Sequence, residues 1–267
     1  MKRKGLHHPT IEDLVELSGI DTLHPGGMEL TRRTAEAAGL RPDTRVLDVS
    51  SDRGTQAIFY AKEFGATVTG VDLSGDMVDS ARQEAALAGL EKKLRFEQGD
   101  SQALPFPDNS FDVVINECAV GIPGDSQAVL NEMVRVARPG ASIVIHESIW
   151  ARDIDLAEKE ELAERYGTTP LEKEQWIVML RRAGIQNIHS EFERWSRPEM
   201  FWNVRKDKLI DHYSRVLTPA EKARTIARVF LRYGPTGVWK AFANERAFYR
   251  AVLQGKIGYC LLWGEKT

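Results

Sequence analysis

Cysteine is scarce in this chain of 267 residues, and long apolar runs are absent. The two cysteines, Cys118 and Cys260, lie far apart in the sequence, so they suggest neither a disulfide framework nor a zinc site. No apolar stretch approaches the roughly 20 residues that a membrane-spanning helix needs. The first nine residues are basic but lack the apolar core of a signal peptide. We therefore expect a cytoplasmic protein without a membrane span.

A strong excess of positive charge is also absent, because the formal net charge is −3. This value argues against a dedicated nucleic-acid binder. The charge is uneven, however, since residues 205–250 carry 11 Lys or Arg against four Asp or Glu. Within them Arg224, Arg228 and Arg232 recur every four residues and form one stripe. We interpret the stripe as a solvated helical face; a stripe facing a ligand would instead predict an anionic substrate.

Apolar strands alternate with helices after about residue 40, and 42% hydrophobic residues suffice for a sizeable core. Five strands are predicted, at Arg45–Val49, Thr67–Asp72, Leu94–Gln98, Phe111–Glu117 and Ala141–Glu147. Helices are predicted between them, at Thr55–Phe64, from Ser74 to about Ala88, and at Gln127–Ala137. This alternation indicates an α/β fold with a mostly parallel, doubly wound, Rossmann-like sheet covered on both faces.

The flanking segments follow other patterns. Residues 10–40 are predicted to form two helices, and we interpret residues 1–40 as a helical lid. Residues 41–150 would form a cofactor-binding core, and 151–267 would complete the sheet. The last part includes a helical insertion at about 199–254, punctuated at Thr218-Pro219 and Gly234-Pro235. We find no flexible linker and expect a single domain over residues 1–267.

Ligands of such sheets bind beyond the carboxyl ends of the strands. The first strand leads into a loop whose small residues, Ser50 and Gly54 among them, allow backbone to approach a ligand. The next strand ends at Asp72, about 20 residues beyond, where a carboxylate can accept two hydrogen bonds from a ribose diol. The third strand leads into Asp100, which is placed to accept from an adenine amino group. These residues follow three strands in order and predict a nucleotide-type site.

At this point the chain resembles the class I S-adenosylmethionine (SAM)-dependent methyltransferases, in particular the small-molecule group with ubiquinone/menaquinone-type C-methyltransferases and methyltransferase type 11 domains. The resemblance covers roughly residues 40–150. It is carried by Val46-Leu-Asp-Val, Val68-Thr-Gly-Val-Asp-Leu-Ser, Gln98-Gly-Asp, Leu104-Pro-Phe-Pro-Asp-Asn-Ser-Phe-Asp-Val-Val and Val136-Ala-Arg-Pro-Gly-Ala.

The resemblance implies SAM as cofactor and a seven-stranded sheet whose last strand is antiparallel. Ile185–Trp195 and Ile257–Trp263 would fill the last two places. It also implies roles for residues at the strand ends. Asp72 would hold the ribose and Leu73 would pack on the adenine; Asp100 and Ser101 would contact the adenine edge, and Glu117 would lie by the methionine.

The first loop departs from the family. An acidic residue is usually followed by three glycines at alternate positions, and here the series is Asp48, Ser50, Asp52, Gly54. Ser50 is small, whereas Asp52 adds a negative charge near the expected methionine. The departure does not favour NAD, whose fingerprint needs glycine at 50, 52 and 55. All four residues are expected to contact the cofactor.

Glu117 and His146 are the candidate catalytic residues. Glu117 ends the fourth strand and is open to two interpretations, as a base or substrate-orienting group and as a cofactor contact. His146 and Glu147 end the fifth strand and should point to opposite faces. His146 is thus a candidate base or a structural histidine. A base is needed only if the acceptor must lose a proton.

The predicted function is methyl transfer from SAM to a small molecule, with an anionic or aromatic acceptor as options and no metal implied. Aromatic residues of the insertion, such as Trp202 and Trp239, are candidates for core or substrate pocket. The alternatives are a transferase using a modified SAM, a non-catalytic SAM-fold binding or regulatory protein, and an RNA-modifying enzyme. The altered loop motivates the first two, and the basic insertion motivates the last. Neither the acceptor atom nor the oligomeric state follows from the sequence.

Overall fold

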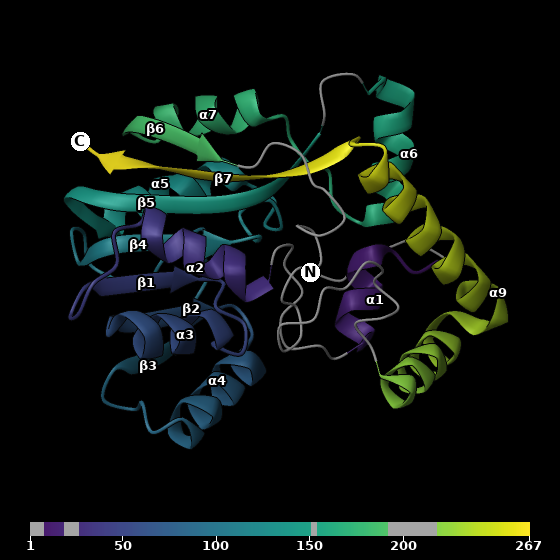
Figure 1. Cartoon of the computed structure of the whole chain (residues 1–267), viewed down its shortest axis with the longest axis horizontal. Helices are drawn as coiled ribbons and strands as arrows, with labels where there is room; N and C mark the ends of the chain where they lie inside the picture. Colours follow the sequence, from purple (N-terminus) through teal and green to yellow (C-terminus); the bar gives the residue numbers. More distant parts are fainter. Residues whose placement is uncertain (1–7, 19–26, 151–153, 192–217) are drawn as a thin grey trace. The chain divides into compact units, whose positions relative to one another are not determined.

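The structure is a computed structural model. It describes residues 8–18, 27–150, 154–191 and 218–267. The chain divides into two compact units (Figure 1). Unit 1 is drawn from residues 1–27, 149–171 and 194–258, and unit 2 from residues 28–148, 172–193 and 259–267.

Unit 2 is built on a seven-stranded sheet in the order β3-β2-β1-β4-β5-β7-β6 (Figure 1). The strands are β1 Arg45–Val49, β2 Thr67–Asp72, β3 Leu94–Gln98, β4 Phe111–Glu117, β5 Ala137–Trp150, β6 Ile185–Glu191 and β7 Ile257–Lys266. The pairs β1–β2, β1–β4, β2–β3 and β4–β5 are parallel, and β6–β7 is antiparallel. The predicted Rossmann-like fold with a final antiparallel strand is confirmed.

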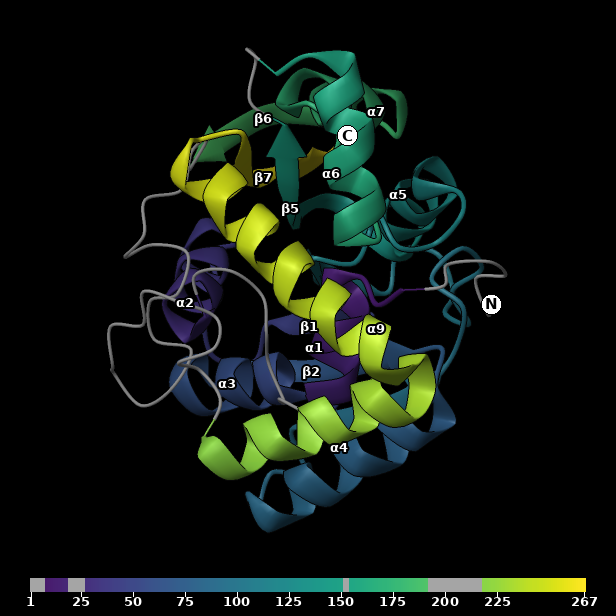
Figure 2. The same cartoon turned by 90° about the vertical axis from the view of Figure 1, so that its right-hand side faces the viewer.

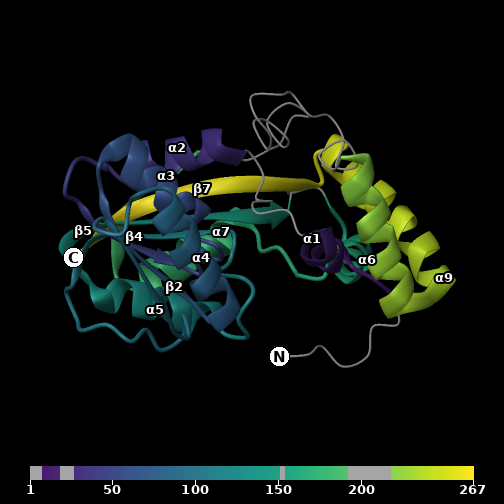
Figure 3. The same cartoon turned by 90° about the horizontal axis from the view of Figure 1, so that it is seen from below.

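Helices cover both faces of this sheet, which explains its apolar central strands. One core joins the sheet to α2 (Gly27–Ala37), α3 (Thr55–Phe64) and α4 (Gly75–Leu87). On the opposite side lie α5 (Ser126–Val136) and α7 (Lys173–Arg182), which contact each other, β4 and β6. Figure 3 shows α2 and α5 on opposite sides of the sheet. The strand order reverses between β1 and β4, so the ends of these two strands mark the expected binding place.

Several strand boundaries differ from the prediction: β5 ends at Trp150 and not at Glu147, and β7 ends at Lys266 and not at Trp263. β5 begins at Ala137 and not at Ala141, because Ala137 pairs with Phe111 of β4 and its carbonyl accepts from Lys266 Nζ at 2.7 Å. Helix α5 therefore ends before Pro139-Gly140, whereas β5 already includes these two residues. β6 is described as far as Glu191, and the rest of its predicted span lies outside the described residues.

Unit 1 contains α1 (Ile11–Ser18), α6 (Leu156–Tyr166) and α9 (Pro219–Leu253). A capping box at Thr218 starts α9, and Gly234, with φ 70°, bends it before Pro235, as the punctuation predicts (Figure 2). Residues 199–217 of the predicted insertion lie outside the described residues. None of the helices that the structure describes is both long and apolar enough to cross a bilayer.

The arginine stripe of α9 runs beside α1. Arg228 donates to the Leu17 carbonyl at 2.8 Å, and Arg232 lies 3.9 Å from Asp13. Both contacts are within unit 1, and the Arg232 side chain remains about half exposed. Part of the stripe thus binds the protein itself.

Candidate functional site

The loop after β1 has left-handed backbone angles at three alternate residues. The angle φ is 61° at Ser50, 46° at Asp52 and 76° at Gly54. These are the three positions at which the resembled family usually has glycine. Because such angles cost an L-residue roughly 1–2 kcal/mol, glycine is the residue that adopts them most easily. The chain therefore keeps the loop's left-handed angles and adds two side chains to it.

Gly54 is the one of the three that cannot accept a side chain. A Cβ atom there would lie 2.6 Å from the Phe96 ring and 3.1 Å from the Ala81 side chain. The Asp52 side chain, in contrast, is exposed. This difference in packing explains why glycine is kept at residue 54 and replaced at residue 52.

The Gly54→Ala variant is expected to lower the free energy of unfolding by about 2–4 kcal/mol. This is the sum of two costs, that of a left-handed backbone angle in alanine and that of an overpacked contact with the Phe96 ring. Ser50→Gly, the matched control, relieves a left-handed angle and should change stability by no more than about 1 kcal/mol. Urea unfolding of both variants measures the difference. Equal effects of the two variants would contradict this account of the loop.

The carboxylate of Asp72, at the end of β2, is turned towards this loop. Its Oδ2 accepts from the Asp52 N–H at 3.0 Å, and its Oδ1 accepts from the Ser74 N–H at 2.9 Å. Each oxygen keeps a second lone pair with which it can accept from a ligand. The next side chain, Leu73, is 66% exposed, which is unusual for a leucine at a strand end and leaves an apolar surface beside the acid.

Asp100 and Ser101 follow β3, as predicted, but their contacts are local. Asp100 is exposed, and its Oδ1 accepts from the Gln102 N–H at 2.9 Å. Ser101 is buried. The bond to Gln102 is typical of a turn-forming aspartate. Their contact with an adenine stays a prediction.

Asp48 is a buried acid near the end of β1. It is 2% exposed, and its Oδ2 has no hydrogen-bond partner among the described residues. Burial raises the pKa of Asp48 well above its ordinary value, and the negative charges of Glu117, Asp72 and Asp52 raise it further. A cation placed here would relieve both effects.

Glu117, at the end of β4, is held by side chains from two helices. Thr31 of α2 donates from Oγ1 to Glu117 Oε2 at 2.9 Å, and the hydroxyl of Tyr60 of α3 donates to Oε1. All three side chains are buried. Glu117 therefore has donors on both of its oxygens.

His146 of β5 joins the same cluster, so the structure brings the two predicted catalytic residues together. Glu117 and His146 are direct partners in the β4–β5 register, and His146 Nε2 lies 3.0 Å from Glu117 Oε2. The hydroxyl of Tyr259, on β7, is hydrogen-bonded to His146 Nδ1. The two rings meet edge to face, with centroids 5.2 Å apart. Both side chains are fully buried.

Glu147 points away from this cluster, as strand alternation predicts. Its Oε1 accepts from the backbone N–H groups of Val120 and Gly121 at 2.7 and 3.3 Å, and so shapes the loop after β4. Asn116 also shapes this region, because it donates to the Val49 carbonyl at 3.0 Å and so ties β4 to the end of β1.

Sequence reasoning missed Thr31, Tyr60, Asn116 and Tyr259. Tyr60 shares the buried face of α3 with alanines, so its spacing marks it only as core. Asn116 did leave a signal, since it is a polar residue in an apolar strand.

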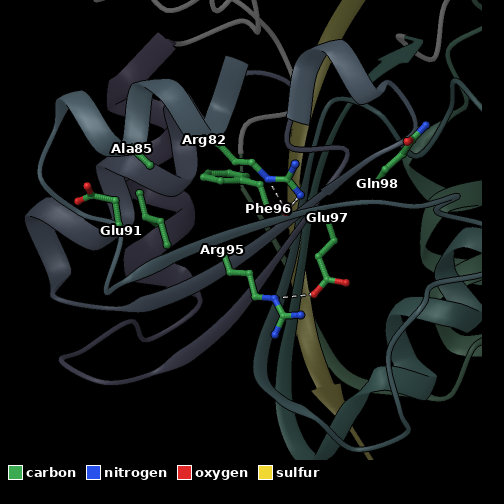
Figure 4. A pocket seen from close by; sticks show the side chains of 8 residues that line it. Arg82, Ala85, Glu91, Arg95, Phe96, Glu97 and Gln98 are labelled. Atoms are coloured by element: carbon green, nitrogen blue, oxygen red, sulfur yellow. Dashed lines mark hydrogen bonds and ion pairs between the residues drawn. The ribbon is translucent and has the colours of Figure 1, made fainter. Parts of the chain in front are cut away.

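A surface pocket of about 520 Å³ lies elsewhere in unit 2, along the edge strand β3 and helix α4. Figure 4 shows its lining: Arg82 points to the Phe96 carbonyl, to which it donates at 2.8 Å, and Arg95 pairs with Glu97. None of the predicted site residues lines this pocket.

Known proteins resemble both the sequence and the fold. A family model described as a methyltransferase domain matches residues 46–140. An uncharacterised protein of Haemophilus influenzae is 30% identical over 174 residues, which are 64% of this chain and 69% of that protein. The chain belongs to the class I SAM-dependent methyltransferases. The predicted enzyme class and cofactor are thereby confirmed at the level of the family.

Other similarities extend further along the chain. Phosphoethanolamine N-methyltransferase 1 of Arabidopsis thaliana is 29% identical over 184 residues, which are 69% of this chain but only 36% of that protein. The solved structure of the [4+2]-cyclase SpnF has a TM-score of 0.71 at 21% identity and covers 98% of this chain and 99% of that one. This second likeness concerns the fold alone.

Proposed function

We propose that this chain transfers a methyl group from SAM to a small-molecule acceptor, with the cofactor held at the ends of β2, β1 and β4. One observation supports this most. Asp72, Asp48 and Glu117 follow one another in the order of the strands in the sheet. SAM has ribose hydroxyls at one part and, towards its methionine end, a sulfonium, an ammonium and a carboxylate, so acids suit its hydroxyl donors and its net positive charge.

The residues present fit this cofactor. Asp48 Oδ2, which is buried and has no donor in the described part of the chain, suits a cationic group, and the exposed Leu73 suits an adenine face. The left-handed loop of Ser50, Asp52 and Gly54 lies beside Asp72, which we propose as the acceptor for the ribose hydroxyls. Asp100 and Ser101 are proposed for the adenine edge. When bound, SAM supplies a methyl group on a positively charged sulfur.

We propose Glu117 as a contact of the cofactor's methionine end and not as a general base. Both of its oxygens accept from buried hydroxyls, and His146 lies beside one of them. His146 is fully buried, with Tyr259 on its other nitrogen, and is not proposed as a base. Catalysis would then rest on orientation of the acceptor and on exclusion of water.

The acceptor is proposed to carry an apolar or aromatic group. In unit 2 the loop after β4, which follows Glu117, exposes Ile122. An anionic acceptor is less well supported, because Arg228 and Arg232 already contact α1. A cytoplasmic location is proposed as well, since Cys118 and Cys260 form no disulfide with each other.

Calorimetry with SAM and S-adenosylhomocysteine (SAH) tests the proposal. We expect one site for each ligand, because both carry the ribose and the ammonium that the acids would hold. Absence of binding by both would overturn the proposed function. Binding without methyl transfer to any compound of a broad apolar and aromatic acceptor panel would favour a non-catalytic SAM-fold protein.

A further inference from the structure

Four buried side chains around Glu117 come from four different elements. Thr31 lies on α2, Tyr60 on α3, His146 on β5 and Tyr259 on β7. Thr31 and Tyr60 donate to the carboxylate directly, and Tyr259 reaches it through His146. Core packing alone does not require these hydrogen-bonding groups, because apolar side chains could fill the same space without needing hydrogen-bond partners.

The phenol groups of Tyr60 and Tyr259 stay protonated in this shell of side chains around Glu117. Burial, and then the charge of Glu117, raises the pKa of Tyr60 well above its ordinary value, and burial does the same for Tyr259. Both phenols therefore remain O–H donors at neutral pH. The Tyr259 hydroxyl is hydrogen-bonded to Nδ1 of His146, and Nε2 of the same ring faces Glu117.

The donors around Glu117 distinguish it from Asp48, the buried acid near the end of β1. Hydrogen bonds donated to a carboxylate favour its ionised form and oppose the effect of burial. Asp48 is equally buried, but its Oδ2 has no donor among the described residues. Two acids at the β1–β4 switch point thus differ in their supporting bonds, and Glu117 is the one whose hydrogen-bond partners favour a negative charge.

We propose that Thr31, Tyr60 and the His146–Tyr259 pair are positioning residues, which hold Glu117 as the fixed anionic partner of the amino group at the methionine end of the cofactor. This inference rests on the proposed function. It follows because Glu117 ends β4 at the switch point, and the ammonium is the part of SAM that needs an anionic partner at every stage, before and after methyl transfer.

Two ligands separate this role from a structural one. SAH carries the amino group, whereas 5′-methylthioadenosine shares the adenosyl thioether and lacks the amino acid. In Tyr60→Phe the ring stays and one charge-assisted hydrogen bond is lost, so we expect SAH binding to weaken about tenfold. Binding of 5′-methylthioadenosine should change less than about twofold, because this ligand does not reach Glu117.

Further variants keep the test decisive if Tyr60→Phe folds poorly. Thr31→Val has nearly the same shape and should reproduce the selective loss for SAH. Tyr259→Phe should show a smaller selective loss, because it acts through His146. Tyr166→Phe, whose ring packs on Phe248 in unit 1, is the matched control and should leave both affinities unchanged.

Equal weakening of both ligands in Tyr60→Phe and Thr31→Val would show a structural role and overturn the inference. Unchanged SAH affinity in both variants would also overturn it. Either result leaves the proposed function intact as long as the unaltered protein binds SAM and SAH. If the unaltered protein binds neither, the proposed function fails and the inference fails with it.

Discussion

Asp72→Ala is expected to lower the affinity for SAM and for SAH about 100-fold, the largest effect of any substitution in the site. The carboxylate is the proposed acceptor for two ribose hydroxyls, and a hydrogen bond to a charged group contributes about 1.5–3 kcal/mol. It also accepts from the backbone N–H groups of Asp52 and Ser74, so its removal frees the loop after β1 as well. Calorimetric titration with both ligands measures the loss.

Two further variants separate ribose binding from loop support. Asp72→Asn keeps one acceptor oxygen and nearly the same shape, so its loss should be intermediate. Asp79→Asn removes an exposed acid of α4 that pairs with Arg82, and should leave both affinities unchanged. An affinity in Asp72→Ala equal to that of the unaltered protein would show that the ribose lies elsewhere.

Asp48→Asn is expected to have two large effects of opposite sign. It should raise the stability of the ligand-free protein by about 1–3 kcal/mol, because it removes a buried acid whose Oδ2 has no donor among the described residues. It should also weaken SAM binding tenfold or more, because the positive end of the cofactor loses a nearby negative charge. Thermal unfolding with and without SAM measures both effects.

The stabilisation by Asp48→Asn should depend on pH. The folded-state pKa of Asp48 is raised, so the folded protein binds a proton that the unfolded chain releases. Stability of the unaltered protein is therefore lost as pH rises from the ordinary aspartate pKa towards the raised one. The advantage of the variant should be small at about pH 4 and larger at about pH 8. A variant that melts below the unaltered protein at both pH values would contradict this account.

The strands and several site residues could be predicted because their signals are local. Val113, Val114 and Ile115 form a continuous apolar run, which is typical of a strand buried on both faces. Asp72 and Glu117 are polar residues at the point where such a run stops, and the ends of parallel strands gather at one edge of the sheet. Neither inference required a contact between distant parts of the chain.

The supporting residues could not be predicted, because their signals are not local. Thr31 is 86 positions from Glu117, and Tyr259 is 113 positions from His146. A threonine on a helix face or a tyrosine on a strand looks like any half-apolar core residue until its partner is known. The same holds for His146, whose neighbour depends on the register between β4 and β5.

The sequence by itself determined the class of fold, the family and the residues at the strand ends, since hydrophobic period and turn chemistry act over a few residues. It also showed that two glycines are replaced in the first loop. Only the tertiary structure decided that Ser50 and Asp52 still take left-handed angles, and that Glu117 has donors on both oxygens while Asp48 Oδ2 has none among the described residues. Backbone angles in a loop and hydrogen bonds across a sheet depend on strand order, register and helix packing, and these are properties of the whole chain.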